Sequence, residues 1–187
     1  ASDQRIAEMT GQPFGDAYFN GLLNDIGAPL DSEPPTTALL AAESLGGLGL
    51  EMLSAEQKAH YVDGRRISES AVLRELAGSI GLDSTAFDAA YAEQSGAATQ
   101  KHIAESRQWL NMLQGQGFPT IGLEFDHPEQ PDQRAIQRID IGEWLGDVDG
   151  WTQQLSDWAE QVAGLKQQTS DSTDPNCGPD GCELPQR

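Results

Sequence analysis

Apolar residues recur at helical spacing through the first part of the chain, and strong end signals separate the segments. The clearest stripe consists of Val72, Leu73, Leu76, Ala77 and Ile80. Gly81 follows this stripe directly, and Asp83 stands where an N-cap would begin another helix. The pattern therefore predicts two successive helices, the first opened by Ser68 and the second by Asp83.

Further helices are predicted on both sides of this pair. The first covers residues 3–9, and a second follows the prolines at 34 and 35 and ends at the glycines 46 and 47. Ser54, with Gln57 three residues later, forms a capping box that predicts another helix start. One face of a longer helix over residues 97–114 is marked by Ile103, Ser106, Leu110 and Leu113.

After residue 117 the apolar period changes from helical to alternating. Ile121, Leu123 and Phe125 alternate with small or polar residues, which is typical of a strand with one buried face. A polar turn over residues 126–132 leads to a second strand that ends at 139–141. We expect an antiparallel hairpin. A last helix then carries a broad apolar face made of Trp151, Leu155, Trp158 and Val162.

The hairpin poses a physical problem, because two strands alone do not give a sheet that is stable in water. Either the hairpin packs wholly on helices, or the sheet needs strands that this chain does not supply. We favour the second alternative. From Lys166 onward the sequence offers almost nothing to bury, so residues 166–187 are predicted to be a flexible tail.

Composition narrows the classes of function. The 187 residues suit one domain, or one domain with a large insertion. A net charge of −19 repels phosphate backbones and anionic lipids, which argues against nucleic-acid or membrane partners. No apolar run approaches the roughly 20 residues of a membrane span, and the first residues lack a signal-peptide pattern. The cytoplasm is the default location.

Thiol chemistry in this sequence is confined to Cys177 and Cys182. Four residues separate them, including two glycines and a proline, so a turn can bring the two sulfurs together. A redox pair, an exposed pair without a role and half of a metal site all remain open. Zinc would need two more ligands, and the histidines are spread over two helices (His60, His102) and a turn (His127). We expect no metal site.

The segment Gly117, Phe118, Pro119 and Thr120 leads from a helix into the first strand. A proline at a strand entrance removes one donor from the ladder and leaves neighbouring backbone groups available to another partner. Local sequence alone favours a trans bond before Pro119, because most X–Pro bonds in folded proteins are trans.

A family resemblance changes that expectation. The sequence GFPT at 117–120 resembles the cis-proline loop of thioredoxin-fold proteins, and the surrounding motifs resemble the DsbA family, close to its FrnE-like branch. These motifs occur in the family's order: DSEPP at 31–35, HYVDGRRI at 60–67 and GLD at 81–83. The likeness extends from about residue 3 to residue 165.

The resemblance implies an α/β, thioredoxin-like fold with a large all-helical insertion. Residues 1–30 would be a helix and connector, 31–114 the insertion, 115–165 the C-terminal half of the thioredoxin-like domain and 166–187 the tail. The family's initial strand, C-x-x-C helix and second strand have no counterpart in residues 1–30. We therefore expect this chain to be the C-terminal portion of a longer protein, or to lack its upstream part.

The implied activity is dithiol–disulfide exchange on protein or small-thiol substrates, with no organic cofactor. Gly117, Phe118, Pro119 and Thr120 would bind substrate, with Pro119 in the cis form. Cys177 and Cys182 would act as an accessory redox pair, because FrnE-like proteins can carry a second pair at this spacing. Whether the protein forms a homo-oligomer stays open. The rival functions are a non-catalytic peptide- or metal-binding protein and an enzyme similar to kappa-class glutathione transferases and isomerases.

Overall fold

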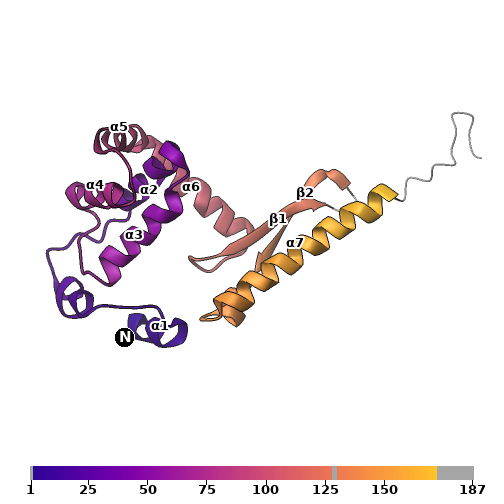
Figure 1. The fold of residues 1–187 in the computed structure, drawn as a ribbon, viewed down its shortest axis with the longest axis horizontal. Coiled ribbons are helices and arrows are strands. Elements are labelled where there is room, and N and C mark those ends of the chain that lie inside the picture. Colours follow the sequence, from indigo (N-terminus) through magenta and orange to yellow (C-terminus); the bar gives the residue numbers. More distant parts are fainter. Residues whose placement is uncertain (1, 128–129, 172–187) are drawn as a thin grey trace, which may run out of the picture. The chain divides into compact units, whose positions relative to one another are not determined.

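The protein forms two compact units, which divide in sequence between Gln114 and Gly115. Figure 1 shows the computed structural model, which describes residues 2–127 and 130–171. The first unit is helical, and the second contains a hairpin and a long helix. The predicted arrangement of helices followed by a hairpin and a last helix is confirmed.

Helix α2 lies at the centre of the first unit and packs against α3, α4, α5 and α6. The elements of this unit are α1 (Ser2–Thr10), the short turns η1 (Ala17–Gly21) and η2 (Leu22–Asn24), α2 (Glu33–Gly46), α3 (Gly49–Tyr61), α4 (Ser70–Ser79), α5 (Ser84–Gln94) and α6 (Ala97–Met112). Ala38, Ala41 and Ala42 of α2 are fully buried, and their small side chains let the neighbouring helices approach closely. Met52, Leu73 and Phe87 supply the larger part of this core.

One buried polar contact joins α2 to α6. The hydroxyl groups of Thr37 on α2 and Thr99 on α6 lie 2.8 Å apart and share a hydrogen bond. Each hydroxyl also lies within hydrogen-bond distance of a backbone carbonyl, that of Glu33 for Thr37 (2.9 Å) and that of Gln94 for Thr99 (2.7 Å), so one hydroxyl donates to its carbonyl and the other donates to that hydroxyl. Because both buried hydroxyls have partners, the start of α6 is fixed against α2 without an unpaired polar group.

Several helix ends follow their local signals. Asp83 caps α5, because its Oδ1 accepts hydrogen bonds from the backbone N–H groups of Thr85 (3.0 Å) and Ala86 (2.9 Å). Helix α2 has its prolines in the first turn, and it ends at Gly47, whose φ of 70° is the left-handed conformation of a C-cap. The Asp83 cap and the end of α2 at the glycines were predicted from sequence and are confirmed, whereas α2 begins at Glu33, before the prolines that we expected it to follow.

Removing the α5 cap should have a measurable effect on stability. We expect Asp83→Ala to lower the free energy of unfolding by about 1 kcal/mol, because two backbone donors lose their acceptor. Urea unfolding followed by circular dichroism measures this change. Asp88→Ala is the matched control, since it removes a carboxylate of α5 that forms only an exposed ion pair with Arg74. Equal losses in the two variants would contradict a capping role.

Two predicted helix starts were wrong. Helix α3 begins at Gly49 and not at Ser54, because the carboxylate of Glu43 accepts the Gly49 N–H (3.0 Å) and allows an earlier start. Helix α4 begins at Ser70. Ser68 does not cap it; its hydroxyl donates instead to the carbonyl of Pro29 (3.1 Å). In both cases the deciding partner is distant from the predicted cap in sequence.

The second unit starts with an antiparallel hairpin of β1 (Ile121–His127) and β2 (Gln130–Ile139), as predicted. Ile121 pairs with Ile139 and Phe125 with Ala135, and the register is irregular between Asp126 and His127. His127 is the last residue of β1. We had expected it in the turn, and that prediction was wrong. Within the described residues the sheet has these two strands.

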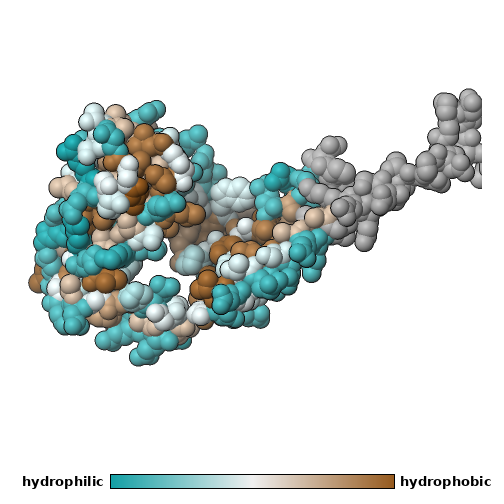
Figure 2. All heavy atoms as spheres, in the orientation of Figure 1, coloured by the Kyte–Doolittle hydropathy of each residue, from teal (hydrophilic) through white to brown (hydrophobic). Residues whose placement is uncertain are grey.

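The long helix α7 (Val148–Asp171) covers the apolar face of β1. Leu123 and Phe125 line a groove together with Leu155 and Trp158 of α7. The rings of Trp144, Trp151 and Trp158 lie within 6.1 Å of one another and connect α7 to the short turn η3 (Ile141–Trp144). Figure 2 shows hydrophobic residues gathered along the hairpin and α7 as well as on the helical unit.

Helix α7 continues past Lys166, where we expected the tail to begin. No glycine or proline interrupts residues 166–171, and each further residue adds one helical hydrogen bond, so the helix extends to Asp171. The rest of the predicted tail lies outside the described residues. Of the described helices, none combines the length and the apolar character that crossing a membrane requires.

Candidate functional site

The loop before β1 is the site predicted from sequence. The peptide bond between Phe118 and Pro119 is cis, as the family resemblance implies and against the expectation from local sequence. Thr120 Oγ1 donates a hydrogen bond of 2.6 Å to the carbonyl of Gly117, which closes the loop on itself. Phe118 is 68% exposed. The loop thus presents an aromatic ring to solvent directly before a strand.

An exposed ring beside a strand entrance is suited to binding an extended peptide, since aromatic side chains bury a large area on contact. The residues of this loop include no thiol, so the loop can position a substrate but cannot exchange a disulfide by itself. Cys177 and Cys182 lie outside the described residues, and their role stays a prediction. No cluster of three metal-ligating side chains occurs within residues 2–127 and 130–171.

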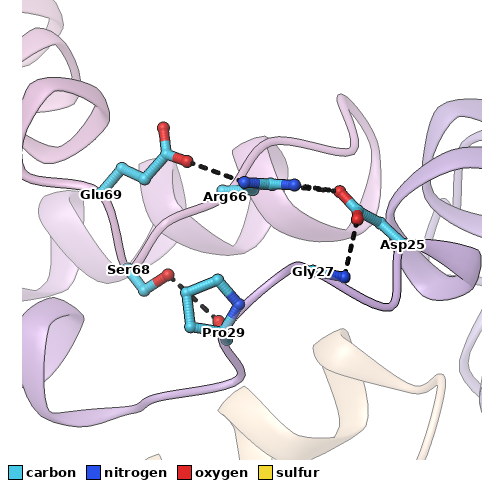
Figure 3. Close-up of polar contacts among 6 residues, drawn as sticks. All are labelled: Asp25, Gly27, Pro29, Arg66, Ser68 and Glu69. Carbon is cyan, nitrogen blue, oxygen red and sulfur yellow. Dashed lines mark hydrogen bonds and ion pairs between the residues drawn. The ribbon is translucent and has the colours of Figure 1, made fainter.

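In the first unit, a set of polar contacts fixes the segment that leads into α2 (Figure 3). The Arg66 guanidinium bonds to the carboxylate of Asp25, and its Nη1 also donates to Glu69 Oε1 (3.3 Å). Asp25 in turn accepts the Gly27 N–H (3.0 Å). The Arg66 guanidinium holds the pKa of Asp25 below its usual value, and Asp25 raises the pKa of Arg66. The cation of Arg66 is therefore already neutralised by its neighbours.

The motif at residues 31–35 forms the first turn of α2 and the residues just before it. Asp31 Oδ1 accepts the Glu33 N–H (2.9 Å), and the side chain of Gln100 donates to Glu33 Oε2 (2.6 Å). Glu33 is the first residue of α2. Its charge lies where the helix dipole favours an anion, which accounts for an acidic residue at this position.

The most perturbed carboxyl group of the described residues was not predicted from the sequence. Glu56 of α3 is only 3% exposed, and burial raises its pKa from 4.5 to about 8. Its Oε1 has no hydrogen-bond partner among the described residues, and the same is true of Nδ1 of His60, one turn further along α3. Burial lowers the pKa of His60. The only sequence signal was the spacing of Glu56 between Met52 and Ala59, two residues of the core face.

The fold has solved relatives. The cytosolic disulfide reductase DsbM from Pseudomonas aeruginosa superposes with a TM-score of 0.79 and 46% identity, over 86% of this chain and 74% of DsbM. The chain belongs to the DsbA family of thiol-disulfide oxidoreductases. DsbM with GSH matches at a TM-score of 0.77 and 45% identity, over 85% of this chain and 74% of that one. No protein-family model and no curated protein matches the chain.

A third relative supports the DsbA-type fold alone. It is a candidate protein disulfide isomerase from Nitrosomonas europaea, with a TM-score of 0.58 and 22% identity, over 81% of this chain and 70% of that protein. Together with DsbM, it confirms the predicted thioredoxin-like fold with a helical insertion. The predicted thiol–disulfide oxidoreductase activity is confirmed by the similarity to DsbM.

Proposed function

We propose that this DsbA-family chain acts in disulfide reduction, with glutathione as its small thiol and protein or peptide disulfides as its substrates. The observation that carries this proposal is the similarity to DsbM with GSH, at 45% identity over 85% of this chain. A reducing compartment such as the cytoplasm suits the proposal, because glutathione keeps thiols reduced there.

The exchange needs no organic cofactor. A cysteine thiolate of the enzyme attacks one sulfur of the substrate disulfide, forms a mixed disulfide and releases the other sulfur as a thiolate. A second enzyme thiol then attacks the mixed disulfide, which frees the reduced substrate and leaves an enzyme disulfide. Two glutathione molecules restore the dithiol in the same way and leave as glutathione disulfide. Two electrons thus pass from glutathione to the substrate.

In this proposal, Gly117, Phe118, Pro119 and Thr120 bind the substrate chain. The ring of Phe118 covers an apolar part of the substrate next to its disulfide, while the hydrogen bond from Thr120 to Gly117 holds the loop. Cys177 and Cys182 form an accessory pair, whose two thiols become a disulfide by exchange with the enzyme disulfide formed above and thereby return that disulfide to two thiols. No C-x-x-C occurs among the 187 residues, so these two sulfurs are the thiols that this sequence itself provides.

The role of Phe118 can be tested in the full-length protein with a dye-labelled peptide that carries one mixed disulfide with glutathione. We expect Phe118→Ala to lower kcat/KM for glutathione-dependent release of that peptide about tenfold, which corresponds to the loss of about 1.4 kcal/mol of contact. Leu50→Ala is the matched control, because Leu50 is also an exposed apolar residue but lies on α3.

Two results would count against this function. One is a wild-type rate that does not depend on glutathione, which would remove the proposed reductant. The other is an unchanged kcat/KM in Phe118→Ala, which would remove the loop from substrate binding. A loss of equal size in Leu50→Ala would show that the effect is not specific to the loop.

A further inference from the structure

The helical unit contains a cavity of about 420 Å³ beside α3. This volume lies in the range of small-molecule sites. Apolar side chains make up most of its wall, among them Leu39, Leu53 and Ile67. Pro29, Arg66 and Ser68 also line it, and the contacts drawn in Figure 3 hold these three residues in place. The cavity wall is therefore largely formed before any ligand arrives.

Two polar atoms without partners belong to residues that line this cavity. Glu56 and His60 are four residues apart on α3, so their side chains lie on the same face of the helix. Within the described residues, neither Glu56 Oε1 nor His60 Nδ1 has a hydrogen-bond partner. An unpaired buried polar group lowers stability, because nothing replaces the hydrogen bonds it made with water. Both atoms are buried, so a ligand in the cavity reaches them only when the two side chains turn toward it, and it then supplies the partners that they lack.

The charges of the cavity wall favour a cationic ligand. Asp31 contributes a carboxylate, Glu56 a carboxyl group that becomes one when it gives up its proton, and Arg66 is the cation among the lining residues. Arg66 is already paired with Asp25 and Glu69, so it offers little attraction to an anion. An ammonium group, in contrast, can donate to a carboxylate and to a neutral imidazole nitrogen at the same time.

We propose that this cavity binds a primary amine with a hydrocarbon body, whose ammonium group donates hydrogen bonds to Glu56 and His60. The hydrocarbon body lies against Leu39, Leu53 and Ile67. This site is independent of the thiol chemistry, because it uses no residue of the loop before β1 and neither of the cysteines.

Proton release distinguishes this site from a simple apolar pocket. Glu56, with a pKa of about 8, is mostly protonated at pH 7, and an ammonium ligand displaces that proton. Tyr91 on α5 faces the charge of Glu56, and Asp31 and Arg66 share its cavity. His60 faces Asp3 of α1 and the ring of Tyr18, whose centroid is 5.5 Å away. Because burial lowers the pKa of His60, its ring stays neutral at pH 7 and can accept a hydrogen bond.

Titration calorimetry of the full chain with benzylamine tests this proposal. We expect binding to be about tenfold tighter at pH 7 than at pH 6, because the ionised fraction of a group with a pKa near 8 rises almost tenfold over that interval. Measurements in two buffers of different ionisation enthalpy should show release of nearly one proton. Benzyl alcohol, which has the same ring but no charge, should bind at least tenfold more weakly than benzylamine at pH 7.

Variants of α3 complete the test. Glu56→Gln should weaken benzylamine binding at least tenfold at pH 7 and abolish the proton release, whereas Glu51→Gln, at an exposed position of the same helix, should leave both unchanged. Equal affinity in Glu56→Gln and wild type, or equal affinity of the wild type for the alcohol and the amine, would overturn the proposal. The proton release of the wild type decides the question even if Glu56→Gln does not fold.

Discussion

Glu56→Met should stabilise the helical unit, and the gain should grow as the pH rises from 5 to 8. Methionine fills a volume similar to that of glutamate and has no buried oxygen to desolvate. At pH 5 the gain is about 1–3 kcal/mol, which is the cost of the unpaired carboxyl group. At pH 8 a further 3–4 kcal/mol is expected from the raised pKa of Glu56.

The sign of this pH dependence follows from proton binding. The pKa of Glu56 is about 8 in the folded protein and 4.5 as a free side chain. Between these two values Glu56 holds one more proton in the folded than in the unfolded state, so its contribution to the free energy of unfolding of the wild type falls as the pH rises. Below pH 4.5 both states are protonated and the contribution is constant. Above pH 8 both are ionised, and the full penalty applies.

Urea unfolding at pH 5, 6, 7 and 8 measures the difference between wild type and Glu56→Met at each pH. The other carboxylates are the same in both proteins, so the difference isolates Glu56. Glu51→Gln is the control, since it removes an exposed carboxylate from the same helix and should run parallel to the wild type. If the curves of wild type and Glu56→Met also run parallel, the carboxyl group is not buried as described.

Local signals predicted the elements whose determinants are close in sequence. Asp83 bonds to N–H groups two and three residues later, and Gly47 ends α2 through its own backbone conformation. The alternation of Ile121, Leu123 and Phe125 was sufficient to predict β1, because residues two apart share one face of a strand. Each of these features depends on a few neighbouring residues, and a sequence displays such features directly.

The errors occurred where a distant residue provides the partner. Ser54 satisfies the pattern of a capping box, yet α3 starts five residues earlier because Glu43 accepts the N–H of Gly49. Ser68 donates to Pro29, 39 residues away in sequence, and does not cap α4. A pattern confined to four or five neighbouring residues cannot reveal such contacts, because they exist only after the helices have packed.

The two candidate sites differ in how far the sequence could predict them. The loop at Phe118 and Pro119 was found through its likeness to a family, since local sequence favoured a trans bond. Glu56 was missed because a glutamate within a helix is normally exposed. Its position on the same face as Met52 and Ala59 was visible, but only the packed structure shows that this face is buried.

Gly64→Ala should destabilise the helical unit by about 3 kcal/mol. Gly64 follows α3 with a φ of +64°, a conformation that costs an L-residue about 1–2 kcal/mol. A Cβ atom at this position would also overlap the backbone carbonyl of Ala17, which adds about 1–3 kcal/mol. The close approach is fixed from the other side by the hydrogen bond from Gly15 N to the carbonyl of Tyr61 (2.9 Å). The segment that carries η1 must therefore move away from the end of α3.

Two further glycines separate the contribution of conformation from that of contact. Gly47 also has a positive φ, but a Cβ there would meet no atom within 4 Å, so Gly47→Ala should cost only the conformational 1–2 kcal/mol, about half the loss at Gly64. Gly78 lies inside α4 in open space, where alanine should add about 0.5–1 kcal/mol of stability. Urea unfolding of the three variants should thus give a large loss, a small loss and a gain.

A loss at Gly64 no larger than that at Gly47 would mean that residues 15–17 are not held against the end of α3. In that case the wall that Leu22 of η2 contributes to the amine cavity would not be fixed either.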